Sequence, residues 1–298
     1  MKDMGEIKTF LGVLVERNRA QKTISLSNRA YLEKILSEYK MEGCNSVSTP
    51  LLLGLHLKPL EKDDSGSYIG IEDHDEYRSL ARSILYASAP CRPDLAYTAG
   101  ALARFMHAPG SEHWSAAKHC LRYIQRTKDY KLIFGPNKEY TGLRIEVYTD
   151  SDFGGDQPTR KSTSGYVSML YGGAVTWRSQ LQKTVALSTM EAEYVALASA
   201  TQEALWLSKL MLDITGDDQL PIPIKCDNTA ALVLAKNPEN HERAKHIDTK
   251  YHMVRDEIEN KRVALEYVES RRNIGDILTK PLTIQLHQYL TSMLGLKK

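Results

Sequence analysis

Residues 143–150 read LRIEVYTD, a run in which apolar and polar side chains alternate and which ends in an acid. That period of two predicts a β-strand with one face in the core. Downstream, SGYVSML and AVTWRSQ predict two more strands, joined by a tight turn at Gly172 and Gly173. Residues 222–227, IPIKCD, predict a fourth strand that again ends in an acid.

The segments between and after these strands carry helical patterns. A long helix is expected from about Ser188 to Ile214, capped by Ser188 or Thr189, and TAALVLAK predicts another after the fourth strand. Residues 244–259 predict a further helix, VALEYVES (263–270) a fifth strand, and GDILTKPL the start of a final helix. Three strands, a helix, and then strands alternating with helices indicate an α/β fold around a mixed sheet.

The first half has a different pattern, and the two halves are expected to meet near residue 140. FLGVLVERN and KTISLS are β-type runs, and a helix should follow from about Asn28, with Ser27 as its cap. After an irregular stretch at 43–75, we expect three helices, over residues 77–84, from near Pro93 and from Ser111. GPNKEYTG (135–142) is the predicted linker.

The composition places this 298-residue, 33.6 kDa chain among globular proteins, with 42% hydrophobic and 26% charged residues. No apolar run approaches the roughly 20 residues that span a bilayer, and the charged N-terminus lacks a signal-peptide pattern, so no membrane partner is expected. The net charge of +2 indicates no partner by itself. The scattered cysteines form no CxxC pair and indicate reduced thiols in an intracellular protein: Cys44, Cys91, Cys120 and Cys226.

Four acids take positions where the active sites of open α/β sheets gather. Asp150 and Asp227 each end a predicted strand, Glu193 lies in the second turn of the long helix, and Asp276 begins the last one. If the two strands are neighbours, their carboxylates repel each other unless a cation joins them. Oxygen ligands suit magnesium or manganese, and two such ions support phosphodiester hydrolysis. Any one of these acids alone would more often cap a helix or form a turn, so only the combination predicts a metal site.

Longer motifs surround these acids, in the order YTDSDFGGD, TRKSTSGYV, TWRSQLQKTVALSTMEAEYVAL, CDNTAA, KHIDTKYH and NIGDILTKPL. In these motifs the chain resembles the ribonuclease H domain of copia-type LTR retrotransposon Pol polyproteins. Upstream, MKDMGEIKTFLG, YRSLARSILYASAPCRPDLAY and HWSAAKHCLRYIQRT resemble the final part of the reverse transcriptase of the same polyproteins. The resemblance spans almost the whole chain.

The resemblance implies a ribonuclease H-like mixed five-stranded sheet with flanking helices at residues 141–298. It implies a truncated reverse transcriptase at residues 1–140, mainly helical and made of palm edge, thumb and connection. The implied activity is hydrolysis of the RNA strand of an RNA–DNA hybrid with two Mg²⁺ ions, for which Mn²⁺ can substitute. Carried over by motif, the catalytic and metal-binding acids are Asp150, Glu193, Asp227 and Asp276.

For two of these assignments, an acid two positions away in the sequence is an alternative. Asp152 alternates onto the same strand face as Asp150 if the strand continues, and Asp150 is preferred because it ends the regular apolar strand. Glu191 and Glu193 are roughly 200° apart on a helix, so only one of them can face the metals, and Glu193 is chosen.

In many domains of this family, a histidine in the loop before the last acid assists product release. Here that loop reads ESRRNIG and contains none. His246 and His252, in the KHIDTKYH motif, are left outside the catalytic set, because histidines near a helix start more often cap or pack.

A hybrid would be held mainly through its phosphates and 2′-hydroxyls. Arg271 and Arg272 could contribute to such a track, although a solvated charged turn explains each basic residue equally well. The predicted substrate contacts are cations and hydroxyls after the first strand and around the third: Arg160, Lys161, Ser162, Thr163, Ser164, Arg178 and Lys183.

The YVDD hairpin that carries polymerase activity in this family occurs nowhere in the chain, so the first half is expected not to polymerise DNA. We expect a fragment of a larger Pol polyprotein that works with the remainder of it. The setting would be the cytoplasm, in the virus-like particles of the parent element, or the nucleus. The competing hypotheses are a non-catalytic remnant that binds nucleic acid or acts as a scaffold, and a relic that makes no stable protein.

Overall fold

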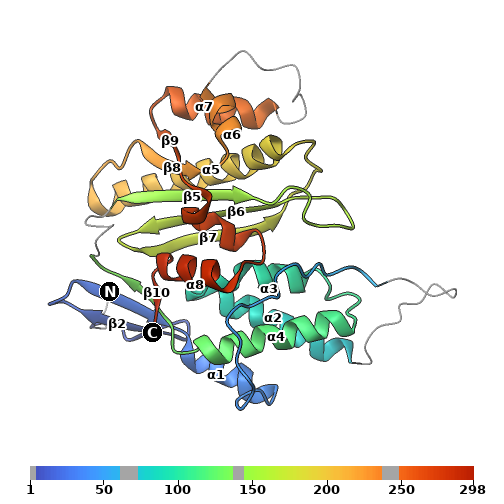
Figure 1. The fold of residues 1–298 in the computed structure, drawn as a ribbon. Coiled ribbons are helices and arrows are strands. Elements are labelled where there is room, and N and C mark those ends of the chain that lie inside the picture. Colours follow the sequence, from blue (N-terminus) through green and yellow to red (C-terminus); the bar gives the residue numbers. More distant parts are fainter. Residues whose placement is uncertain (1–4, 61–72, 137–143, 237–247) are drawn as a thin grey trace. The chain divides into compact units, whose positions relative to one another are not determined.

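The computed structural model describes residues 5–60, 73–136, 144–236 and 248–298, and the chain divides into two compact units (Figure 1). Unit 1 comprises Met1–Asn137 together with Pro281–Lys298, and unit 2 comprises Lys138–Lys280. Each unit has a hydrophobic core of its own. Among the described residues, none of the helices combines the length and the apolar character needed to cross a membrane.

Unit 2 is built on the expected mixed sheet of five strands, in the order β7-β6-β5-β8-β9. Strands β5 (Ile145–Ser151), β6 (Thr163–Leu170) and β7 (Gly173–Leu181) form an antiparallel meander. Strands β8 (Ile222–Cys226) and β9 (Val263–Tyr267) follow in parallel to β5. The tight turn between β6 and β7 falls one residue earlier than predicted, with left-handed backbone at Tyr171 and Gly172.

Helix α5 (Thr189–Thr215) packs on β5, β6 and β8, and it begins after Ser188, whose side chain accepts a hydrogen bond from the Glu191 backbone. Alanines four residues apart give α5 a flat, fully buried stripe against the sheet: Ala192, Ala196, Ala200 and Ala204. Helices α6 (Thr229–Lys236) and α7 (Asp248–Glu259) pack against α5.

The segment GDILTKPL does not begin an α-helix, contrary to the prediction. Its first residues belong to a short 3₁₀ turn, η4 (Ile274–Leu278), which lies against β5 and β6. A second 3₁₀ turn, η3 (Ser270–Arg272), precedes it. Pro281 disfavours helical backbone at the residue before it, so the last helix starts only at Ile284.

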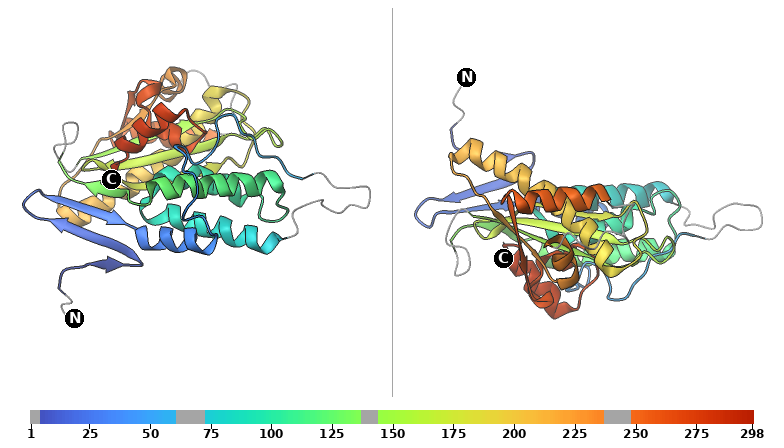
Figure 2. Two further views of the ribbon diagram at one scale, coloured as in Figure 1. Left: turned by 60° about the horizontal axis from the view of Figure 1, so that its bottom comes forward. Right: turned by 90° about the horizontal axis from the view of Figure 1, so that it is seen from above.

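Unit 1 combines an antiparallel five-stranded sheet with a group of helices (Figure 2). The sheet order is β1-β2-β3-β4-β10, with bounds β1 (Thr9–Phe10), β2 (Val13–Asn18), β3 (Thr23–Ser27), β4 (Lys131–Phe134) and β10 (Leu296–Lys297). The helical elements are α1 (Arg29–Glu38), α2 (His74–Cys91), η1 (Pro93–Leu95), α3 (Ala96–Ala103), α4 (Ser111–Thr127) and α8 (Ile284–Met293). Helices α1, α2 and α4 pack against one another around the core.

The end of the chain belongs to unit 1, whereas the expected second domain runs over residues 141–298. Strand β10 pairs with β4, and the ring of His287 in α8 packs edge-on against Tyr123 of α4 at 5.3 Å between ring centroids. Neither β4 nor β10 was predicted, because strands of four and two residues carry too little periodicity. The predicted linker lies mostly outside the described residues.

The cap of α1 is also one residue later than predicted. Asn28 occupies the cap position, and its side chain donates to the carbonyl of Ala87 in α2 rather than capping α1. This buried bond ties the start of α1 to α2, a tertiary role that a local capping pattern cannot indicate.

Candidate active site

The register of two parallel strands positions the first pair of acids. Tyr148 of β5 pairs with Lys225 of β8, so the residues two positions further along, Asp150 and Asp227, reach the same edge of the sheet. Oxygen atoms of Asp150, Asp227 and Asp276 all lie within 4.8 Å of one another. The neighbouring carboxylates expected from the strand ends are therefore present.

Helix α5 contributes the fourth acid. A carboxylate oxygen of Glu193 lies within 4.8 Å of the ligand atoms of Cys226 and Asp227. We call Asp150, Glu193, Asp227 and Asp276 the carboxylate cluster. Three of its members, Asp150, Glu193 and Asp276, are at most 7% exposed, so their charges interact through a medium of low dielectric constant.

Two glycines allow η4 to approach the strands closely enough to complete this cluster. A Cβ atom on Gly275 would lie 2.9 Å from the backbone nitrogen of Asp150, and one on Gly165 of β6 would lie 2.8 Å from Cβ of Leu278. The obstacle at Gly275 is backbone, which cannot move aside as a flexible side chain can. Glycine at this position therefore sets the approach of η4, and with it Asp276, to β5.

Polar side chains just before η4 hold Asp227. Ser270 Oγ donates to Asp227 Oδ2 at 2.6 Å, and Asn273 Nδ2 donates to Asp227 Oδ1 at 3.3 Å. The same amide donates to the carbonyl of Thr149 at 3.0 Å, while its oxygen accepts from the Gly275 backbone. Asn273 is fully buried and so links the ends of β5 and β8 to η4.

Residues just after η4 hold Asp150. The hydroxyl of Thr279 donates to Asp150 Oδ2. The ammonium nitrogen of Lys280 lies 3.1 Å from Asp276 Oδ1 and 3.5 Å from Asp150 Oδ2. The sequence did not indicate roles for four residues that lie within an eleven-residue stretch around Asp276: Ser270, Asn273, Thr279 and Lys280.

The environment raises the proton affinity of the cluster. Burial raises the pKa of Glu193 to about 9, and repulsion from Asp150 and Asp227 adds to the shift. Burial and then Asp150 raise the pKa of Asp276 to about 7, against the opposing effect of Lys280. Burial lowers the pKa of Lys280, but Asp150 and Asp276 outweigh it and hold that pKa above its ordinary value. Without an added cation, the cluster therefore retains protons at neutral pH.

The two competing acids have other roles. Asp152 accepts a hydrogen bond from the backbone nitrogen of Thr163 and is not in the cluster. Glu191 Oε2 accepts from the backbone nitrogen of Leu187 at 2.8 Å, which closes a capping arrangement with Ser188 at the start of α5. Of each pair, the acid chosen from the sequence is the one that the structure places in the cluster.

The donor set of the cluster fits a hard divalent cation. It offers carboxylate oxygens on buried, mutually repelling groups, which is the chemistry that Mg²⁺ and Mn²⁺ prefer. Cys226 lies beside Glu193, with Sγ 3.9 Å from Oε2, but burial raises the pKa of this thiol far above neutrality. A neutral thiol is a poor ligand, so the acids are the residues that could hold a metal.

The predicted substrate contacts are only partly accessible. Ser162 is fully buried, with its hydroxyl accepting from the Gly154 backbone, and Thr163 is 6% exposed, so neither side chain can reach a substrate as predicted. Ser164 accepts from Gln182 at 2.8 Å and is half-buried, as is Lys161. Three cations of the predicted set are exposed: Arg160, Arg178 and Lys183. Arg271 and Arg272, which could add to the same track, are exposed as well.

The histidines of the KHIDTKYH motif add nothing to the cluster within the described part of the chain. His252 is exposed on α7 and is not among the residues grouped with the carboxylates. His246 lies outside the described residues.

No protein-family profile matches the chain. It is similar to the retrovirus-related Pol polyprotein from transposon TNT 1-94 of Nicotiana tabacum, with 35% identity over 99% of this chain and 22% of that protein. Pol polyproteins of two further transposons match the whole chain at 32–33% identity. The chain spans about a fifth of the length of these curated relatives.

A shorter relative is the secreted RxLR effector protein 161 of Plasmopara viticola, 47% identical over 132 residues, which is 44% of this chain and 91% of that protein. Among solved structures, the N-terminal RNase H domain of rv2228c from Mycobacterium tuberculosis matches 51% of this chain and 98% of its own. It does so with 12% identity and a TM-score of 0.35, a likeness too low to bear on function.

Proposed function

We propose that this chain, which belongs to the Pol polyprotein family of copia-type transposons, is a ribonuclease H that hydrolyses the RNA strand of RNA–DNA hybrids. The observation that carries the proposal is the carboxylate cluster at the ends of two parallel strands. Four acids from four separate elements, three of them almost fully buried, cost stability through mutual repulsion. Bound cations would offset this repulsion, so the cost is consistent with a cluster whose function is to bind cations.

Asp150, Glu193, Asp227 and Asp276 would hold two Mg²⁺ ions, and Mn²⁺ would substitute. When bound, such ions supply an activated water and charge stabilisation for the departing 3′-oxygen of a phosphodiester. The protein's own contribution is to orient the ligands. Ser270 and Asn273 fix Asp227, while Thr279 and Lys280 fix Asp150. These contacts fix the orientation of the two carboxylates, so that they face the cluster rather than the solvent.

The substrate would be held through its backbone by exposed cations of unit 2. Arg160 follows β5, Arg178 lies on β7, Lys183 follows β7, and Arg271 and Arg272 form part of η3. A guanidinium or ammonium group binds phosphate without regard to base sequence, which suits a nuclease that acts on hybrids of any sequence. Unit 1, which lacks the YVDD motif, would position the hybrid or the remainder of the polyprotein rather than polymerise DNA.

The test is magnesium-dependent cleavage of an RNA–DNA hybrid by the full chain and by Asp227→Asn. We expect the variant to lose at least about 100-fold in rate, because an amide cannot replace a charged ligand. Asp213→Asn is the matched control, since Asp213 is an exposed acid of α5 outside the cluster. Full activity in Asp227→Asn would contradict the proposed site. Hybrid binding without cleavage by the folded wild-type chain would instead support a non-catalytic remnant.

A further inference from the structure

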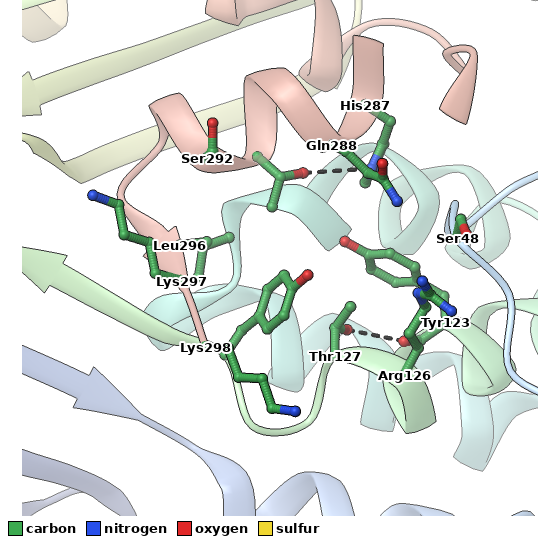
Figure 3. A pocket seen from close by; sticks show the side chains of 12 residues that line it. Ser48, Tyr123, Arg126, Thr127, His287, Gln288, Ser292, Leu296, Lys297 and Lys298 are labelled. Carbon is green, nitrogen blue, oxygen red and sulfur yellow. Dashed lines mark hydrogen bonds between the residues drawn. The ribbon is translucent and has the colours of Figure 1, made fainter. Parts of the chain in front are cut away.

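Unit 1 contains a cavity that the proposed nuclease activity does not use. It lies between α4 and the C-terminal segment that carries α8 and β10, and has a volume of about 100 Å³ (Figure 3). That is room for several water molecules, or for one tetrahedral oxyanion. Figure 3 shows Tyr123 of α4 and His287 of α8 facing the same space.

The side chains around this cavity are dominated by hydrogen-bond donors. Arg126 supplies positive charge, while Tyr130 and Thr291 supply hydroxyl groups. Neither Asp nor Glu is among the described residues that line it. A cavity lined in this way favours an anion with several acceptor oxygens.

His287 provides a second and independent indication of a ligand. Its side chain is 3% exposed, its Nδ1 lies 3.4 Å from the hydroxyl of Thr291, and its Nε2 is buried. Within the described part of the chain, Nε2 has no hydrogen-bond partner. A buried ring nitrogen without a partner is costly, so a group in the cavity that bonds to it would remove a penalty.

The acid that contacts Tyr123 is already neutralised. Arg92 donates to both carboxylate oxygens of Asp94, at 2.9 and 2.7 Å, and the hydroxyl of Tyr123 donates to the same carboxylate at 2.7 Å. Both Arg92 and Asp94 are at most 1% exposed. Asp94 therefore does not cancel the positive charge that Arg126 brings to the cavity.

We propose that this cavity binds a phosphate group, with Arg126 supplying the charge and His287 Nε2 a hydrogen bond. The site goes beyond the proposed nuclease activity, because it lies wholly in unit 1 and uses none of the carboxylate cluster. The phosphate belongs either to a free phosphate or nucleotide or to the backbone of a nucleic acid. A bound phosphate would also join α8 and β10 to α4.

The test uses the full chain and two probes, inorganic phosphate and a short single-stranded DNA oligonucleotide, followed by ³¹P line broadening and calorimetry. We expect phosphate to bind and to slow hydrogen exchange in α8. Arg126→Ala and His287→Asn should each weaken binding about tenfold, the first by removing charge and the second by removing the Nε2 position while keeping a group near Thr291. Arg17→Ala is the matched control, since Arg17 is an exposed arginine of β2 that does not line the cavity.

The outcomes separate the two sources of phosphate. Binding of inorganic phosphate that is lost in Arg126→Ala supports a site for free phosphate. Oligonucleotide binding that depends on Arg126, without binding of the free ion, supports a backbone contact. If neither probe binds, or if Arg126→Ala and Arg17→Ala bind phosphate equally well, the proposal is wrong. Since Arg126 is exposed, its variant is expected to fold even if His287→Asn does not.

Discussion

Lys280 Nζ lies 3.1 Å from Asp276 Oδ1, a carboxylate oxygen of the carboxylate cluster. The same ammonium group is 3.5 Å from Asp150 Oδ2. Lys280 thus partly neutralises the two carboxylates between which it lies. Because a divalent cation would need these oxygens, the lysine both stabilises the metal-free protein and competes with the metal.

Lys280→Met should therefore have two opposite effects. In EDTA the variant should be less stable than the wild type, because Asp150 and Asp276 lose their counter-charge. Its affinity for Mn²⁺, measured by electron paramagnetic resonance, should rise roughly fivefold, because the competing cation is gone. Lys225→Met is the matched control, since Lys225 pairs with Glu146 at 2.8 Å elsewhere on the sheet. A variant that loses both stability and Mn²⁺ affinity would show that Lys280 is only structural.

The stability of metal-free unit 2 should fall as the pH rises. Burial and repulsion raise the pKa of Glu193 from 4.5 to about 9, so between these values the folded state holds a proton that the unfolded state has lost. By linkage, the free energy of unfolding decreases with pH across this window. Hydrogen exchange in β5 and α5, measured in EDTA at pH 6 and 8.5, should accelerate at the higher pH beyond its intrinsic rate. Glu193→Gln should flatten the dependence, and an equally steep slope in the variant would exclude Glu193 as the cause.

Asn273→Ala should impair both stability and cleavage. Its amide donates to Thr149 and Asp227, and its oxygen accepts from Gly275, so the truncation leaves buried groups unpaired at a cost of about 1–3 kcal/mol. Loss of the bond to Asp227 should slow hybrid cleavage roughly tenfold, as expected for a residue that orients a metal ligand. Denaturant titration and cleavage rates check the two effects. Asn260→Ala, at an exposed site just after α7, should change neither, and wild-type cleavage by Asn273→Ala would contradict the orienting role.

Unit 1 should be sensitive to acid. Burial lowers the pKa of His287 from 6.5 to about 4, against the opposing charge of Asp94 and with a smaller contribution from Arg92, so the folded state excludes a proton that the unfolded state binds below pH 6.5. Stability is then lost as the pH falls from about 6.5 toward 4, by up to about 3 kcal/mol. Hydrogen exchange in α4 and α8 at pH 7.5 and 5.5 measures this loss. His287→Gln should reduce the pH dependence, and identical profiles would assign it to other groups.

The sheet of unit 2 and the choice of acids were predictable because both depend on short-range pattern. The runs 143–150 and 222–227 indicated two strands that end in acids, and the sheet indeed places these strands side by side in parallel. Helix geometry indicated only that Glu191 and Glu193 cannot both face the metals, and the choice of Glu193 came from the resemblance of its motif.

What the sequence did not indicate depends on contacts between distant positions. Asn273 bonds to Thr149 across 124 residues, and β10 pairs with β4 although the whole of unit 2 lies between them in the chain. Ser162 belongs to a run that looks like a polar, solvated turn, but its hydroxyl is buried because it satisfies the backbone of Gly154. Such roles are set by the packed structure rather than by spacing.

The most direct measurement is cleavage of three labelled duplexes by the full chain in magnesium: an RNA–DNA hybrid, double-stranded RNA and double-stranded DNA. Each is to be run beside Asp150→Asn, in which the cluster loses the acid at the end of β5. Our account predicts cleavage of the hybrid's RNA strand alone, with 5′-phosphate and 3′-hydroxyl ends, and loss of cleavage in the variant. Absence of cleavage by a folded wild-type chain in Mg²⁺ and in Mn²⁺, or cleavage that persists in Asp150→Asn, would contradict it.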